Sequence, residues 1–337
     1  MSSTVRLWRN SRANFALPAK FIDYYLCRRG VPRSECSELW GTPHGGGMEI
    51  NMAISKERQL ILDRIADYEK RGLFDRDVND DPPTRPLRPG EVDYTCKKLS
   101  TRIAKRIANK VGQNHFEKMM KNGDVVLKEI KGRENLSAIE STGALITCNH
   151  FSVFDNYAVY KAVAPILGKR DLYKIIREGN YTSFPGLYGY LFRHCNTLPL
   201  SSSLSCMKEL LAALHVLFSR GEKILIYPEQ GMWHNYRKPR PLKLGSFRFA
   251  AKENVPVLPI FITLEDTDRH DADGMPIQAY TVHILPAIFP DKALSLRENS
   301  MRMCLENYKL WKATYEAFYG IQLEYTTEGE VNPCSST

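Results

Sequence analysis

Between residue 124 and about residue 290, short apolar strands alternate with helices, and this alternation restricts the chain to a fold built around a β-sheet. Runs rich in aliphatic and β-branched residues predict strands at 124–130, 144–148, 223–227, 255–263 and 280–285. Helical patterns predict helices at 204–219, 245–253 and 293–319. We therefore predict an α/β domain over 124–290, with helices on the faces of its sheet, followed by a C-terminal helix and tail over 291–337.

The residues before position 124 have a different pattern. Residues 1–47 are rich in arginine and poor in acids, and we expect a disordered extension there. A transit peptide and a start codon placed too early are alternatives for the same stretch. Residues 48–123 predict a helical, membrane-associating region, in which a helix over 53–72 and a Pro-rich linker to about residue 92 come first.

A second helix in this region, over 96–111, has the clearest amphipathic pattern in the chain. Apolar residues recur at every fourth position, at Leu99, Ile103, Ile107 and Val111. Lysines and arginines surround this stripe, and no acid lies between Asp93 and Glu117. Two interpretations fit equally well: a helix packed on the core with a solvated basic face, or a helix lying on anionic lipid headgroups.

The overall charge narrows the classes of partner. The net charge is +9 and the sequence pI is about 9.0, which favours an anionic partner such as a membrane surface, a phosphate-bearing substrate or a nucleic acid. No nucleic-acid-binding module is recognisable, so we expect no nucleic-acid partner. No apolar run approaches the roughly 18 residues that span a bilayer. A lipid-directed role therefore predicts a peripheral protein without a transmembrane helix, on the cytoplasmic side of a membrane.

The cysteines support a cytosolic compartment. Eight are scattered through the chain, and no two form a C-x-x-C pair. This spacing predicts reduced thiols rather than a disulfide framework or a zinc site, and we expect neither a metal nor a cofactor.

One histidine lies where the chemistry of an α/β sheet is usually placed. His150 follows directly after the predicted strand 144–148, and Asp155 comes five residues later. If His150 lies on the turn before a helix and Asp155 in the first turn of that helix, the carboxylate accepts the Nδ1 proton and leaves Nε2 free as a base. Such a base acts directly on a hydroxyl brought by the substrate, so no neighbouring Ser or Cys is needed.

Four blocks in a fixed order extend this pattern over about residues 124–290. They are Asn149-His150-x4-Asp155; Ile176-Arg177-Glu178 with Phe184-Pro185, Gly189-x-x-Phe192-Arg193 and Thr197-Leu198-Pro199-Leu200; Tyr227-Pro228-Glu229-Gln230-Gly231; and Val255-Pro256-Val257-Leu258-Pro259-Ile260. Together they resemble the NHx4D motif and the three following motifs of the lysophospholipid acyltransferases, the PlsC-like 1-acyl-sn-glycerol-3-phosphate acyltransferases. Lys243-Leu244-Gly245 also fits. The resemblance implies a mixed sheet flanked by helices.

The resemblance also implies an activity and roles for the residues. An acyl group would pass from acyl-CoA or acyl carrier protein, as co-substrate, to the free hydroxyl of a lysophospholipid, most simply 1-acyl-sn-glycerol-3-phosphate. His150 would be the base and Asp155 would orient it. Glu229 and Gly231 would help to hold the acceptor, and nearby backbone N–H groups would stabilise the oxyanion.

The sequence departs from the family pattern at the cations. The Thr-Arg that usually ends the third block is replaced by Gln230-Gly231-Met232-Trp233, and the usual arginine after the second block is replaced by serines. The phosphate of the acceptor must then be bound by other cations, and the candidates are Arg177, Arg193, Arg237, Lys238, Arg240 and Lys243. Among these the dense cluster at 237–240 is our first choice.

Two alternatives remain open. The acceptor is another lysolipid or glycerol 3-phosphate, or the protein is a peripheral lipid-binding protein without catalysis. The presence of His150, Asp155 and Glu229 argues against the second.

Overall fold

The computed structural model describes residues 54–80 and 84–335. The elements below lie in one compact unit, Ile54–Asp271 with Met275–Thr337. The expectations for residues 1–47 lie outside the described part of the chain.

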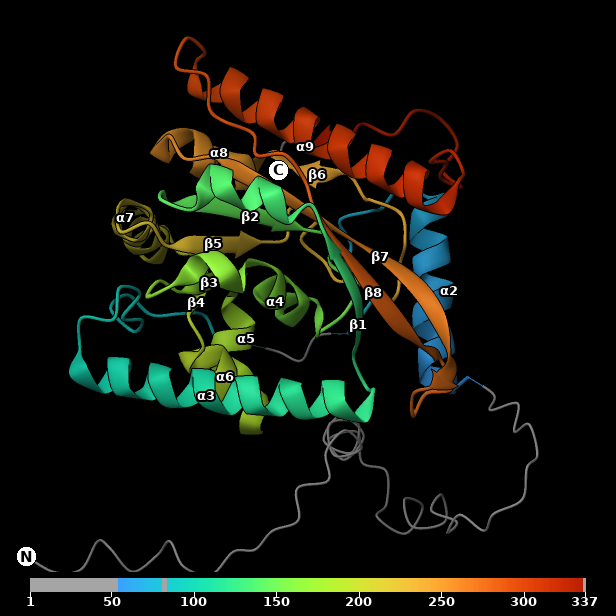
Figure 1. Ribbon diagram of the computed structural model, residues 1–337, viewed down its shortest axis with the longest axis horizontal. Coiled ribbons are helices and arrows are strands. Elements are labelled where there is room, and N and C mark those ends of the chain that lie inside the picture. The colour runs from blue at the N-terminus through green and yellow to red at the C-terminus, as the bar shows by residue number, and fades with distance from the viewer. Residues whose placement is uncertain (1–53, 81–83, 336–337) are drawn as a thin grey trace, which may run out of the picture. The chain divides into compact units, whose positions relative to one another are not determined.

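A seven-stranded mixed sheet forms the centre of this unit (Figure 1). Its order is β1(Val126–Lys131), β8(Pro276–Ile284), β7(Val257–His270), β2(Ala144–Cys148), β5(Lys223–Ile226), β3(Leu172–Arg177) and β4(Thr197–Leu200). The strands from β7 to β4 are parallel to one another, whereas β8 runs antiparallel to β7 and carries β1 parallel to itself. The predicted fold class is therefore confirmed. Because β7, β2, β5 and β3 are parallel, their carboxyl ends share one edge of the sheet.

Each face of the sheet is covered by helices, because successive strand residues alternate between two apolar cores. Leu145 packs in one core, with the helices α7(Leu204–Ser219), α8(Leu244–Glu253) and α9(Leu296–Tyr319). Its neighbour Ile146 packs in the other, with η1(Arg133–Ile139) and α4(Asp155–Leu167). Two shorter helices, α5(Glu178–Ser183) and α6(Gly186–His194), connect β3 to β4.

The predicted N-terminal helices are present as α2(Lys56–Lys70) and α3(Leu99–Asn122). The α3 helix is longer than predicted and ends at Gly123, whose positive φ of 74° closes the last turn. It lies along α6 (Figure 1). Its predicted apolar stripe is not a core face, since Leu99, Ile103 and Ile107 are 68%, 50% and 52% exposed. Within the described residues, no helix combines the length and the apolar composition needed to cross a membrane.

A third apolar cluster attaches the segment around α2 to a loop that follows β5. Ile65, Phe74 and Val78 pack against the fully buried Trp233. This cluster fixes a segment from before the linker beside the third sequence block.

The C-terminal tail returns to the domain, where β9(Cys334–Ser335) pairs with β6(Leu242–Lys243). This return brings Cys334 to Cys304 of α9, and the two form a disulfide with a Cα–Cα distance of 6.3 Å. The expectation of reduced thiols is wrong for this pair, because a pairing across 30 residues depends on how the tail folds back and leaves no local spacing signal. Since disulfides are uncommon in cytosolic proteins, the cytoplasmic expectation loses the support of the cysteines.

Candidate active site

His150 emerges at the carboxyl edge of the sheet because the strand before it is held in place on both sides. All five residues of β2 are buried, and β2 pairs in parallel with β5 and β7. Just beyond the strand, the buried Asn149 side chain accepts from the Ile262 N–H at 2.8 Å and donates to the Ile262 carbonyl at 3.0 Å. This pair of bonds fixes the point at which His150 leaves the sheet.

Asp155 is the first residue of α4 and lies under the ring of His150. Its Oδ2 is 2.8 Å from His150 Nδ1, and the side chain of Asp155 is fully buried. The same oxygen accepts from the backbone N–H groups of Phe151 at 3.2 Å and Ser152 at 3.3 Å, which holds the turn in shape. A carboxylate partner makes Nδ1 the protonated nitrogen, and no described residue bonds to Nε2. The contact predicted from the five-residue spacing is therefore present.

Tyr227 completes this arrangement from the next strand along the sheet. Its hydroxyl donates to Asp155 Oδ1 at 2.6 Å, and its ring stacks on His150 with centroids 3.9 Å apart. Burial and the nearby Asp155 charge raise the pKa of Tyr227 well above its ordinary value, so the hydroxyl remains a donor. The sequence pattern includes Tyr227 in the third block but predicts no role for it. The signal was its place directly after the strand that pairs with β2.

Glu229 connects the backbone of His150 to Arg240 through its carboxylate. Its carboxylate accepts from the His150 N–H at 3.0 Å, the Arg240 N–H at 2.8 Å and the Arg240 guanidinium at 3.0 Å. The Glu229 and Arg240 side chains are 2% and 1% exposed. Neither end of this pair is accessible to a substrate.

Arg240 cannot therefore bind the phosphate of an acceptor, and that part of our prediction is wrong. Its guanidinium also donates to the carbonyl of Phe74 at 3.0 Å and to that of Gly231, and it lies 4.8 Å from the centre of the Trp233 ring. The physical reason is that a buried carboxylate at 229 needs a buried cation, and Arg240 supplies it.

The loop that contains Gly231 forms hydrogen bonds both to the His150 turn and to the segment that follows α2. The Trp233 N–H donates to the His150 carbonyl at 3.1 Å, and the Trp233 indole donates to the Arg76 carbonyl at 3.0 Å. A Cβ at Gly231 would lie 3.0 Å from the Asp77 carboxylate and 3.9 Å from the Arg177 guanidinium, so there is little room for a side chain.

The other five candidate cations all have partners within the chain. The contacts are Arg177 with Asp77, Arg237 with Asp266 (2.8 Å), Lys238 with Glu69 (2.7 Å), Lys243 with Asp75 (3.1 Å), and Arg193 with the carbonyl of Phe184 (3.0 Å). Three of the four acids belong to one short stretch, residues 69–77, which the cluster around Trp233 holds in place. The cluster at 237–240 is thus tied into the fold rather than open as a group.

No thiol competes with His150 for a role in the site. Cys148 is fully buried, and burial raises its pKa well above the ordinary value, which keeps it a thiol. In the part of the chain that the structure describes, no group of three His, Cys, Asp or Glu side chains is placed to hold a metal ion. The arrangement is thus a single imidazole with one basic nitrogen presented at a sheet edge.

Residues 128–263 match the family model described as Acyltransferase. One similar solved structure is the crystal structure of the 1-acyl-sn-glycerophosphate (LPA) acyltransferase, PlsC, from Thermotoga maritima; the two chains are 18% identical over 68% of this chain and 87% of that chain, with a TM-score of 0.44. No curated protein matches the sequence.

Proposed function

We propose that the protein moves an acyl group from a thioester onto the free hydroxyl of a lysophospholipid, with His150 as the base, and the match of residues 128–263 to the family model described as Acyltransferase supports this proposal. The donor is acyl-CoA or acyl carrier protein, and 1-acyl-sn-glycerol-3-phosphate is the acceptor that we favour. The observation that carries the proposal is the orientation of His150, whose Nδ1 is bound by Asp155 at 2.8 Å.

The reaction follows from this orientation. Nε2 takes the proton of the acceptor hydroxyl as its oxygen attacks the thioester carbonyl carbon, and the carbonyl oxygen becomes an oxyanion. The carbon–sulfur bond then breaks, the carbonyl re-forms, and the leaving thiolate takes the proton back from Nε2. Asp155 stabilises the imidazolium between these steps. Tyr227 holds the other oxygen of that carboxylate.

Backbone donors for the oxyanion are limited around His150. The N–H of His150 is taken by Glu229, and those of Phe151 and Ser152 are taken by Asp155. The N–H of Val153 donates to no described residue, and Val153 as a whole residue is 44% exposed. We assign the oxyanion to this amide.

Arg177 and Lys243 are the cations that we assign to the acceptor phosphate. Arg177 ends β3 at the same sheet edge as His150, and its ion pair with Asp77 is open, with side chains 44% and 43% exposed. The Lys243 N–H donates to the Pro228 carbonyl at 2.8 Å, which places Lys243 beside the third block. An exposed ion pair contributes only about 0–1 kcal/mol, so a doubly charged phosphate can replace Asp77 as the partner of Arg177. The Lys243 side chain is 13% exposed and its partner Asp75 is 49% exposed, so that pair is open to solvent on the Asp75 side.

A membrane surface is the site of action that we propose, because the substrate is a lipid and α3 carries an exposed apolar stripe. Leu99, Ile103 and Ile107 lie on one face of a helix that is rich in basic residues. Such a helix lies in the interface between headgroups and acyl chains.

The decisive assay combines purified protein with acyl-CoA or acyl carrier protein and a panel of lysolipids and glycerol 3-phosphate, with the product identified by mass. We expect His150→Ala to lower kcat by ~10²–10⁴ while the protein stays folded. His215→Ala is the matched control, because His215 is 73% exposed on α7 and pairs only with Glu253. A folded His150→Ala protein with full turnover would refute the mechanism, and no acyl transfer to any acceptor would favour the lipid-binding alternative.

A further inference from the structure

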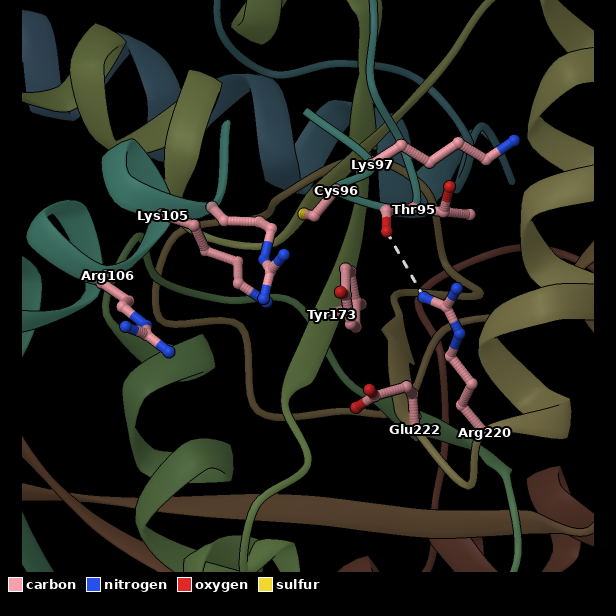
Figure 2. Close-up of a pocket in the computed structure, with 9 residues that line it drawn as sticks. Thr95, Cys96, Lys97, Lys105, Arg106, Tyr173, Arg220 and Glu222 are labelled. Atoms are coloured by element: carbon pink, nitrogen blue, oxygen red, sulfur yellow. Dashed lines mark hydrogen bonds between the residues drawn. The ribbon is translucent and has the colours of Figure 1, made fainter. Parts of the chain in front are cut away.

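Figure 2 shows a cavity of about 440 Å³ beside the start of α3. Its lining residues come from the start of α3, from the segment before it, and from the amino ends of β3 and β5; they are Thr95, Cys96, Lys97, Arg102, Lys105, Arg106, Tyr173, Arg220 and Glu222. Because β2, β5 and β3 are parallel, His150 follows the carboxyl end of β2 whereas Glu222 precedes the amino end of β5. The cavity is therefore separate from the proposed reaction site.

The lining is strongly basic, with five lysine or arginine side chains against one carboxylate. That carboxylate, Glu222, already accepts from the Asp171 N–H at 2.6 Å. Lys105 is paired with Asp171 at 2.6 Å, and Arg220 donates to the Thr95 carbonyl at 3.3 Å. Figure 2 shows Lys105 and Arg106 on one side of Tyr173 and Arg220 on the other.

Three of these cations differ from the cations near His150. The side chains of Lys97, Arg102 and Arg106 make no hydrogen bond or ion pair with any residue in the described ranges 54–80 and 84–335. Like charges gathered around one cavity repel one another and lower stability, and an anion that enters the cavity removes that cost. The cavity is thus complementary to a phosphate-bearing ligand.

The nature of that ligand follows from the helix surface beside the cavity. Leu99, Ile103 and Ile107 form the exposed stripe of α3, and at 3.6 residues per turn Arg102 and Arg106 lie on the neighbouring face. A ligand that contacts both faces carries an anionic group and a hydrocarbon chain. We propose that the cavity binds the phosphate of an anionic phospholipid in the membrane surface while the stripe inserts among the acyl chains beside it.

The opposite end of α3 explains why such an anchor serves the enzyme. Near its carboxyl end, Phe116 stacks on Tyr157 at 4.7 Å and meets Phe154 edge-on at 6.2 Å, and both of these residues follow closely after His150. A 24-residue helix is roughly 36 Å long, so α3 lying on a membrane would be anchored at one end and would carry the reaction site at the other.

The experiment compares two double variants of the full chain that remove the same charge. Arg102→Gln/Arg106→Gln changes the cavity, and Lys98→Gln/Lys110→Gln changes exposed positions of the α3 region outside its lining. Both are tested by sedimentation with phosphatidylcholine vesicles that contain increasing amounts of phosphatidylglycerol. We expect the cavity variant to bind anionic vesicles at least tenfold more weakly than the control variant.

Two outcomes would overturn the proposal. Equal losses in the two variants would mean that α3 attracts anionic lipid only through diffuse charge. If millimolar inorganic phosphate binds in the cavity while the protein binds anionic and neutral vesicles equally, the ligand is a free anion and not a lipid. Acyl transfer between soluble short-chain substrates is measured in parallel, and we expect it to be unchanged in both variants, so failure of the anchor is distinguishable from failure of the proposed reaction.

Discussion

The buried pair of Glu229 and Arg240 provides the sharpest test of how this site is built. The two side chains are 2% and 1% exposed and meet at 3.0 Å. Removing one partner leaves the other charge buried and unpaired, which costs about 3–5 kcal/mol. We therefore predict that Arg240→Met lowers the free energy of unfolding by about 3–5 kcal/mol.

The matched control is Arg237→Met, three residues earlier in the same loop. Arg237 pairs with Asp266, and these side chains are 40% and 56% exposed. The same substitution there should cost about 0–1 kcal/mol, because water screens an exposed pair. Urea unfolding followed by circular dichroism measures both values, and similar slopes against urea show that the unfolded state is comparable.

A double variant separates loss of the pair from loss of packing. In Glu229→Gln/Arg240→Met no buried charge is left unpaired, so the double variant should be less destabilised than the sum of the two single variants. The reasoning fails if Arg240→Met keeps wild-type stability and raises only the KM for the acceptor, because Arg240 would then be a binding residue.

Three further predictions concern the reaction and pH. Asp155→Asn should lower kcat more than it raises either KM, since it misorients His150, as steady-state kinetics will show. Arg177→Gln should raise the KM for lysophosphatidic acid tenfold or more and leave the KM for a neutral lysolipid unchanged, because a hydrogen bond to a charged group contributes ~1.5–3 kcal/mol. If the ratio of these two KM values does not change, Arg177 does not bind the phosphate. Burial, with a smaller contribution from Lys131, lowers the pKa of His283 from 6.5 to about 4, so the unfolded chain binds the extra proton between these values. Stability should therefore fall as pH drops from 6.5 through 4, by at most roughly 3 kcal/mol, and urea titrations should find this fall missing in His283→Gln.

The fold was predictable wherever burial leaves a periodic signal. The strand predicted at 144–148 is β2 as observed, because all five of its residues are buried. The strand predicted at 255–263 is β7, which continues to His270, because its exposed second half is held only by pairing with β8. The sequence pattern predicts neither β3 nor β4. The strand β4 is four residues long, includes a proline and lies at the sheet edge, so its signal is weak.

The candidate site was predictable only in its local part. His150 and Asp155 are five residues apart, so one turn decides whether they meet. Tyr227 contacts both residues because β5 lies next to β2 in the sheet. The spacing of residues along the chain does not predict this strand order. The resemblance of its motif predicts that Glu229 helps to hold the acceptor, whereas its burial depends on the pairing with Arg240, which no local sequence pattern reveals.

The cations show most clearly why local charge does not reveal a ligand site. The cluster at 237–240 is the densest group of positive charge after the third block, yet Lys238 pairs with Glu69, more than 160 positions earlier, and Arg240 turns inward to Glu229. At the start of α3, folding supplies a partner to Lys105 but none within the described ranges to the side chains of Lys97, Arg102 and Arg106. The two acids beside its first turns, Asp171 and Glu222, directly precede β3 and β5; Asp171 pairs with Lys105, and Glu222 accepts from the Asp171 N–H. A cation cluster therefore indicates an external anion when its unpaired state survives the tertiary contacts, and in the described part of this chain that criterion selects the cavity beside α3 rather than the more conspicuous loop near His150.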